Sequence, residues 1–299
     1  DLKSLQCKTA RFYLKQGQKE IALAYFIKAE VWTEAENILV EIARDLVSKG
    51  RGQSFINYLN ELPAGNRAHP EFLMALGDEQ CYINNYKRAI AYYRKAAEIY
   101  REKKDNYGLS QAYKGIGKVY VDIIEPGEAH LFLRKAYKIL SKEHGEERAN
   151  ILGLLAETMI NQGKPHLAER YRSLAGDKYY FDDEHNLQAR ILLRTGKIID
   201  AIKHLEKKSE VEKKMRKATF SYRETSLLLS MCYSMIGEVK KAREAAEEAI
   251  AMGESLKSPF VTALGYTRLG HSMLLDQRRV KKEENWKAYD KALEQVDNL

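Results

Sequence analysis

The sequence predicts an all-α protein built from repeated helix pairs, and three observations support this expectation. Long stretches of its 299 residues consist of Ala, Leu, Glu, Lys, Arg and Tyr, without the alternation of β-branched residues typical of strands. Only 5 Pro and 18 Gly occur, so few positions interrupt a helix. A short pattern also recurs along the chain, which is longer than a single compact core usually allows. Together these observations favour a stack of repeats.

The recurring pattern places small residues at regular intervals. A turn residue, usually Gly, is followed about five residues later by a small residue, then by an apolar residue four positions further on, and usually by Ala after three more. The first copy is Gly17, Ala22, Phe26 and Ala29. The small anchor residues of the clear copies are Ala22, Ala89, Ala129, Ala168, Ala201 and Ala242, and those from Ala89 onward lie 33 to 41 residues apart. Each trio falls on one face of a helix, where small side chains let another helix approach.

A degenerate copy fits between the first two anchors, at Gly50, Phe55, Leu59 and Leu62. A second helix is expected before each turn, most clearly over 112–120 and again over 266–273, where aromatic, apolar and Gly residues recur at matching offsets.

Two-helix units of this length, with Ala or Gly at the close contacts, are typical of tetratricopeptide-like repeats. We therefore expect an all-α, tetratricopeptide-like right-handed superhelix of about eight antiparallel helix pairs. We also expect one solenoid over residues 1–299, as a fragment of a longer chain. The expected pairs are approximately 2–29, 31–62, 69–102, 105–141, 144–176, 181–213, 216–253 and 258–297.

Composition and leader signals argue for a cytoplasmic protein without membrane contact. No apolar run is long enough to span a bilayer, and no secretory leader is recognisable. Cys7, Cys81 and Cys232 form no CxxC motif and are expected to be reduced thiols within the core. The net charge of +8 would suit nucleic acid, but Glu residues interrupt the basic runs, as on solvated helix faces. We expect no direct nucleic-acid binding.

No motif indicates catalysis, a metal or a cofactor. The run Gly115-Ile116-Gly117-Lys118 lies within a helical pattern, and Val119 stands where a phosphate-binding loop needs Ser or Thr. The seven histidines include no pair spaced i, i+4, and no GxSxG context occurs. The sequence therefore predicts a binding protein, with no enzyme activity and no cofactor.

Candidate binding residues follow from the first helix of each pair, which lines the concave groove in tetratricopeptide stacks. Polar groups about one turn from the tight Gly or Ala contact are the candidates, because they could orient a polar ligand or peptide. They are Gln111, Lys114, Lys118, Asn150, Glu157, Asn186, Arg190, Glu224 and His271. The alternative for each residue is that it is an ordinary solvated polar side chain without a specific role.

The first part of the chain also carries a more specific order of residues. The segments concerned are 10–17 (ARFYLKQG), 20–29, Trp32 with Ala35 and Ile38-Leu39, 46–51 (LVSKGR), 58–63 (YLNELP) and 69–78 (HPEFLMALGD). This order resembles the superhelical repeat domain of MalT-like transcriptional activators, large ATP-dependent bacterial regulators of the signal-transduction ATPase class. The resemblance covers residues 1 to about 140 and is merely repeat-like afterwards. Tyr58 stands where the family usually has Trp, a conservative change.

The resemblance implies a sensor that receives an inducer and relays its binding to an adjacent ATPase and DNA-binding module of the parent chain. The phosphate-binding motif and a recognisable DNA reader are both missing from these residues, so those modules would lie outside them. Expected partners are a protein, a peptide or a small-molecule inducer in the concave groove. The alternative is a stand-alone protein-interaction scaffold or a receptor for a quorum-signal peptide.

Overall fold

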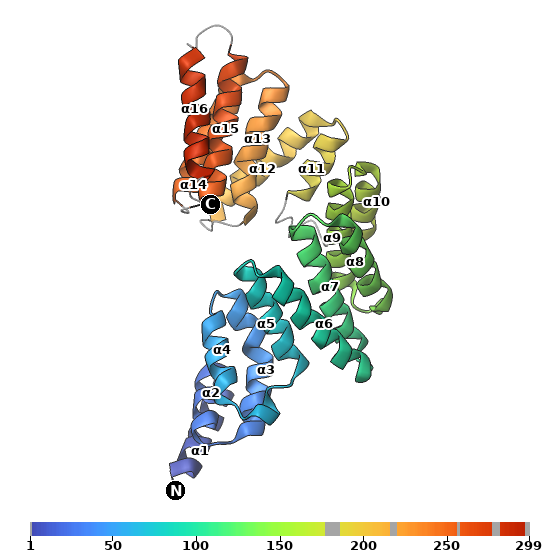
Figure 1. Ribbon diagram of the computed structural model, residues 1–299, viewed down its shortest axis with the longest axis vertical. Coiled ribbons are helices and arrows are strands. Elements are labelled where there is room, and N and C mark those ends of the chain that lie inside the picture. Colours follow the sequence, from blue (N-terminus) through green and yellow to red (C-terminus); the bar gives the residue numbers. More distant parts are fainter. Residues whose placement is uncertain (1, 177–185, 216–219, 256–257, 277–281, 297–299) are drawn as a thin grey trace. The chain divides into compact units, whose positions relative to one another are not determined.

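A computed structural model describes residues 2–176, 186–215, 220–255, 258–276 and 282–296. The described residues fold into α-helices and one 3₁₀ turn, as the sequence predicts (Figure 1). The ranges 181–185 and 216–219, with which two expected helix pairs begin, and residue 297, with which the last pair ends, lie outside the described residues. Contacts divide the chain into two compact units, Asp1–Thr158 and Met159–Leu299. That these units form one right-handed solenoid stays a prediction.

The first unit contains eight complete helices and most of a ninth. They are α1 (Leu2–Lys15), α2 (Lys19–Lys28), α3 (Trp32–Ser48), α4 (Gly52–Glu61), the 3₁₀ turn η1 (Ala64–Asn66), α5 (Pro70–Tyr82), α6 (Tyr86–Glu102), α7 (Asn106–Asp122), α8 (Pro126–Ile139) and α9 (Gly145–Asn161). Consecutive helices from α1 to α4 and from α5 to α8 pack against each other, and α3 also contacts α5, as α5 contacts α7. The first helix of one pair therefore packs against the first helix of the next, which is the contact pattern of stacked repeats.

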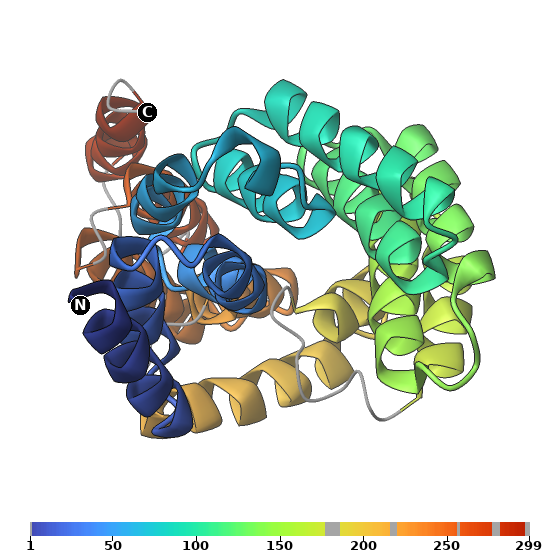
Figure 2. The same ribbon diagram turned by 90° about the horizontal axis from the view of Figure 1, so that it is seen from below.

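The second unit repeats this arrangement. Its helices are α10 (Pro165–Ala175), α11 (Leu187–Arg194), α12 (Ile198–Met215), α13 (Phe220–Met235), α14 (Val239–Ser255), α15 (Pro259–Leu275) and α16 (Lys282–Val296), after the end of α9. Each helix from α10 to α15 contacts its successor, and α13 contacts α15. In the view of Figure 2 the consecutive helices can be followed through each unit by colour.

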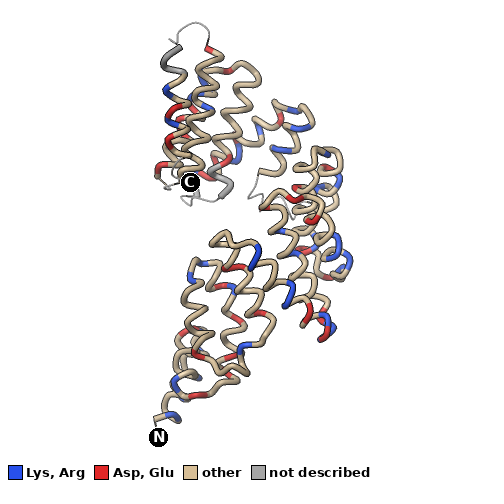
Figure 3. The backbone as a smooth tube through the Cα atoms, viewed as in Figure 1, with Lys and Arg blue, Asp and Glu red and all other residues tan. Residues whose placement is uncertain are grey.

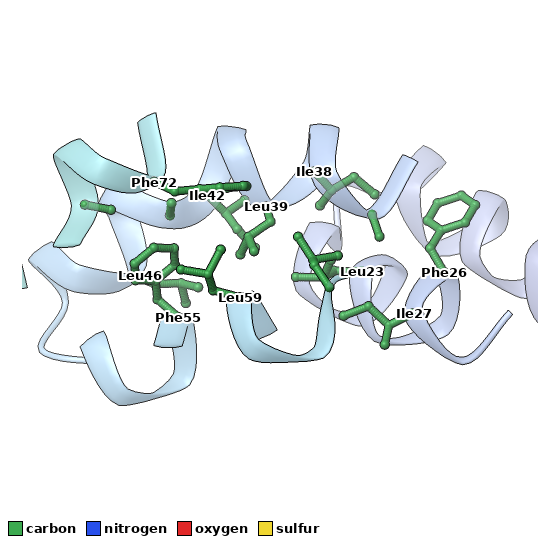
Figure 4. Close-up of a cluster of buried hydrophobic side chains, with 14 of the residues drawn as sticks. Leu23, Phe26, Ile27, Ile38, Leu39, Ile42, Leu46, Phe55, Leu59 and Phe72 are labelled. Atoms are coloured by element: carbon green, nitrogen blue, oxygen red, sulfur yellow. The ribbon is translucent and has the colours of Figure 1, made fainter. Parts of the chain in front are cut away.

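The predicted packing stripes are buried, because they face neighbouring helices. Ala22, Ala89 and Ala129 have no exposed surface, and neither do Ala168, Ala201 and Ala242 in the later copies. The degenerate second copy of the pattern also faces the core, since Phe55 and Leu62 are buried. Figure 4 shows this part of the core, where Leu23, Leu39 and Phe72 from three helices lie among other buried side chains. The prediction that these small residues lie on a buried packing face is therefore confirmed.

Basic and acidic residues are interspersed along the helices of each unit (Figure 3). No helix among the described residues is long and apolar enough to cross a membrane. Gly115 and Gly117 lie inside α7, so the run 115–118 is helical, as its sequence context predicts.

Candidate functional site

A tyrosine that fits between two glycines organises the centre of the first unit. Tyr93 of α6 is buried, and its ring lies against Gly77 of α5 and Gly115 of α7. A Cβ atom at Gly77 would lie 2.5 Å from the ring, and one at Gly115 would lie 3.0 Å away. Only glycine leaves room for an aromatic ring at this distance. The two glycines thus fix Tyr93 between the first helices of adjacent pairs.

The hydroxyl of Tyr93 anchors an acidic residue that also binds a cation. Tyr93 donates a hydrogen bond to Asp78 Oδ1 at 2.6 Å, and Arg44 Nε of α3 donates to Asp78 Oδ2 at 2.7 Å. Burial and the neighbouring Asp78 carboxylate raise the pKa of Tyr93, so its hydroxyl stays a proton donor. Asp78, which lies on α5, therefore connects α3, α5 and α6.

A second carboxylate lies near the start of α5. Glu71 accepts a hydrogen bond from the Tyr100 hydroxyl, and the Tyr100 ring fills the space beside Gly108 of α7. Burial and the bond to Glu71 raise the pKa of Tyr100. Burial by itself would lower the pKa of the Arg44 guanidinium. The carboxylates of Asp78 and, to a smaller extent, Glu71 lie close to Arg44 and raise its pKa above the usual value.

An ion pair continues the polar surface from α7 to α9. Lys114 Nζ lies 2.9 Å from Glu147 Oε2, and the two side chains are only 21% and 24% exposed. Burial alone would raise the pKa of the Glu147 carboxyl, but Lys114, and to a smaller extent Gln111, hold the pKa below its usual value. The Gln111 side chain therefore lies beside Glu147, although its buried Nε2 atom makes no hydrogen bond of good geometry with the described residues.

We call Arg44, Glu71, Asp78, Gln111, Lys114 and Glu147 the first-helix cluster, because all six lie on α3, α5, α7 or α9. The Tyr107 ring borders the cluster at a ring-centroid distance of 4.8 Å from His144, and Tyr107 is 44% exposed. Burial and the charge of Glu147 raise the pKa of Tyr107, and Arg44 opposes them, so these groups share one electrostatic environment. The cluster offers fixed charges of both signs, a buried amide donor and an aromatic ring, which suits a polar ligand or peptide.

The sequence-predicted residues of the first unit are spread along two helices. Gln111 and Lys114 both lie beside Glu147. Lys118 is exposed on α7, and its charge partly offsets the rise that burial causes in the pKa of the Cys81 thiol. On α9, Asn150 is half-buried and Glu157 is buried.

The predicted residues of the second unit have different surroundings. Asn186 is fully buried, precedes α11 with a left-handed φ of 49°, and accepts a hydrogen bond from Thr225 Oγ1 at 3.4 Å. Arg190 Nη2 donates to Asn161 Oδ1 at 3.0 Å. Glu224 on α13 and His271 on α15 are exposed. That any of the nine residues contacts a ligand stays a prediction.

Sequence reasoning missed Arg44, Glu71, Asp78 and Glu147. A usable signal existed, because Arg44 follows buried Ala43 directly, as Asp78 follows Gly77. The bonded pairs Arg44–Asp78 and Lys114–Glu147 are also separated by 34 and 33 residues, about one repeat. Opposite charges one repeat apart on first helices would have identified both pairs.

Among the described residues, no group of three or more His, Cys, Asp or Glu side chains is placed to hold a metal ion. The described cysteines are not paired in disulfides. Burial raises the pKa of the Cys232 thiol to about 11, which disfavours a reactive thiolate.

Comparison with known proteins identifies the fold. No family profile matches the sequence, and no curated protein matches it. A solved structure of a Signal Transduction ATPase with Numerous Domains (STAND) protein with a tetratricopeptide repeat sensor, from Pyrococcus horikoshii, is similar over 99% of this chain at 18% identity and a TM-score of 0.60. The chain spans 52% of that protein's length.

A human IFIT1 dimer with PPP-AAAA is similar over 97% of this chain and 66% of its own, at 17% identity and a TM-score of 0.56. At such low identity these likenesses define the fold alone. The chain is an all-helical, tetratricopeptide-like repeat protein.

Proposed function

We propose that this chain is the effector-sensing region of a larger signal-transduction ATPase and that the first-helix cluster receives the effector. The carrying observation is the half-buried set of charges on α3, α5, α7 and α9, with the unpartnered Gln111 amide beside the Lys114–Glu147 pair. A buried donor without a partner is unusual and is a suitable contact for an acceptor group of a ligand. The archaeal ATPase with a tetratricopeptide repeat sensor supports the same assignment by its fold.

The finer form of the proposal is a MalT-like bacterial transcriptional regulator located in the cytoplasm. Effector binding to the repeats would be relayed to adjacent ATPase and DNA-binding modules of the parent chain. Such a relay requires that the effector bind one state of the regulator more tightly than the other, because a ligand shifts an equilibrium only by its differential affinity. The effector is a small-molecule inducer, a peptide or a protein, and the repeat region itself needs no cofactor.

A thermal-shift screen tests the proposal, because a ligand that binds only the folded state raises the melting temperature. The panel contains sugars, sugar phosphates, nucleotides, short peptides and PPP-AAAA, the last because of the IFIT1 structure. We expect a hit whose shift is lost in Lys114→Ala and Gln111→Ala, each measured against the variant's own melting temperature. The matched control is Lys138→Ala, an exposed lysine on α8 outside the cluster. A hit unaffected by both cluster variants would contradict the assignment of the site.

The alternative function is a stand-alone interaction scaffold or peptide receptor, which the fold supports equally. The parent gene distinguishes the two, since a phosphate-binding GxxxxGK[ST] motif upstream of these residues favours the ATPase sensor. A gene without that motif, together with a stable complex between this region and another protein, would replace the sensor by the scaffold.

A further inference from the structure

One turn of the first unit contains an isoleucine where the backbone favours glycine. In seven helix pairs, the turn that joins the two helices contains one residue with positive φ, always at the same position of the turn. These residues are Gly17, Gly50, Asn84, Ile124, Gly163, Gly196 and Gly237. Gly and Asn adopt this left-handed conformation readily, whereas a β-branched side chain is strained in it. Ile124, with a φ of 59°, is therefore a local conformational outlier.

Exposure to water does not favour an isoleucine at position 124 either. Its side chain is 70% exposed, and the preceding Ile123 is 38% exposed. Four other turns have polar residues at the position of Ile123, namely Gln16, Lys49, Gln162 and Thr195. A strained and exposed apolar residue persists when it has a role outside the fold, because strain is otherwise removed by substitution.

The neighbouring turn supplies two more exposed apolar side chains. Tyr82, the last residue of α5, and Ile83, which follows it, are 56% and 59% exposed. The two turns are adjacent, since α5 contacts α7, and the Asp122 carboxylate contributes to the raised pKa of both Tyr86 and Cys81. We call Tyr82, Ile83, Ile123 and Ile124 the turn patch. It shares no residue with the first-helix cluster.

From this patch we propose that the turns between α5 and α6 and between α7 and α8 dock a short amphipathic helix of a protein partner. Even fully exposed, one tyrosine and three isoleucines would offer less than the ~800 Å² per partner of a standard stable interface, which disfavours a stable dimer of this chain. Packed helices lie about 8–10 Å apart, and residues two turns apart on a helix are separated by about 10 Å, so one helix can reach both turns with two apolar side chains.

The charges around the patch favour a protein over a lipid surface. Asp122, Glu125 and Glu128 are exposed in and next to the α7–α8 turn, and Lys87 and Arg88 are exposed at the start of α6. Three carboxylates would repel anionic headgroups, whereas a helix with charges of both signs beside its apolar face can match this rim.

The test uses a phage-displayed library of helical peptides selected on the wild-type chain. We expect enriched peptides with apolar residues seven positions apart, and a dissociation constant at least tenfold weaker for Ile124→Gly and Ile124→Asn. Ile236→Ser is the control, because Ile236 is a 39% exposed isoleucine of the α13–α14 turn, at the position that corresponds to Ile123. Its affinity for the enriched peptides should equal that of the wild type.

The melting temperature gives a second readout, and the substitution should raise it although it weakens peptide binding. Ile124→Gly should raise Tm by about 2–4 °C while it weakens peptide binding, since glycine relieves the left-handed strain. A lower Tm would show that Ile124 supports the fold and would overturn the proposal. So would the absence of enriched peptides, or peptides that bind the Ile124 variants as well as the wild type.

Two further measurements examine other occupants. Self-association in sedimentation that is lost in Ile124→Gly would assign the patch to a second copy of the chain. Flotation with phosphatidylglycerol vesicles that is lost in the same variant would assign it to a membrane surface. Either result would replace the proposed helix.

Discussion

Lys114 Nζ and Glu147 Oε2 lie 2.9 Å apart and connect the first helices of two successive pairs, α7 and α9. Both side chains are mostly buried, so the pair is screened less than an exposed ion pair. Removal of either partner leaves a charge in surroundings that solvate it poorly.

Lys114→Ala should lower the free energy of unfolding by about 1–3 kcal/mol, because Glu147 then remains half-buried without its cation. Denaturant unfolding at pH 7 measures this cost, with Lys138→Ala as an exposed control expected to change stability by less than about 0.5 kcal/mol. A double variant with Glu147→Gln should recover part of the loss. Equal effects of Lys114→Ala and Lys138→Ala would show that the ion pair adds nothing.

The contribution of Glu147 should depend on pH in the acidic range. Its pKa is lower in the folded chain than the usual 4.5, so folding favours the ionised form. The stabilisation is therefore fully present above pH 4.5 and is lost as the pH falls through the lower, folded-state pKa. The stability difference between wild type and Glu147→Gln, measured by urea unfolding, should shrink over that interval. If this stability difference grew on acidification, folding would raise the pKa of Glu147 and the prediction would be wrong.

Gly77→Ala should destabilise the first unit by about 1–3 kcal/mol, because the new Cβ would lie 2.5 Å from the buried ring of Tyr93. Gly115→Ala should cost less, since its Cβ would lie 3.0 Å from the same ring. The matched control is Gly127→Ala in α8, where no atom lies within 4 Å of the added carbon. That substitution should stabilise the chain by about 0.4–1 kcal/mol through the unfolded state. Thermal unfolding of the three variants gives the order, and a neutral Gly77→Ala would disprove the tight fit.

Tyr93→Phe should cost about 1–2 kcal/mol while it preserves the packing of the ring. The change removes the hydroxyl that donates to Asp78 Oδ1, and Arg44 remains the partner of Oδ2. Tyr92→Phe on the same helix is the control, because Tyr92 is only half-buried. Chemical unfolding compares the two variants, and identical curves would indicate that Asp78 is satisfied without Tyr93.

The helix pairs could be predicted because their signals are local. Gly17, Ala22 and Phe26 lie within three turns of chain, and a close helix contact requires a small residue at one of these positions wherever the repeat occurs. Pro70, Pro126 and Pro165 each stand at the start of a helix, which is likewise a preference of the local sequence.

The candidate site could be predicted only in part. Gln111 and Lys114 are predicted from their offset to a tight Gly or Ala contact, but their partner Glu147 belongs to the next pair. Asn186 has the residue type of a groove contact and is nevertheless fully buried, because its neighbourhood includes Thr225, 39 residues away. Residue type and helical offset do not reveal which polar groups find partners across helices.

The sequence by itself determined the all-helical class, the repeat length and the small residues at which helices meet, because these depend on spacing within one or two helices. The tertiary structure decided which side chains meet across pairs, as in Arg44 with Asp78, Lys114 with Glu147 and Tyr93 between Gly77 and Gly115. It also showed that the left-handed turn position is occupied by an exposed isoleucine at 124. Such relationships depend on how successive repeats stack, and stacking is set by the packing of many side chains at once.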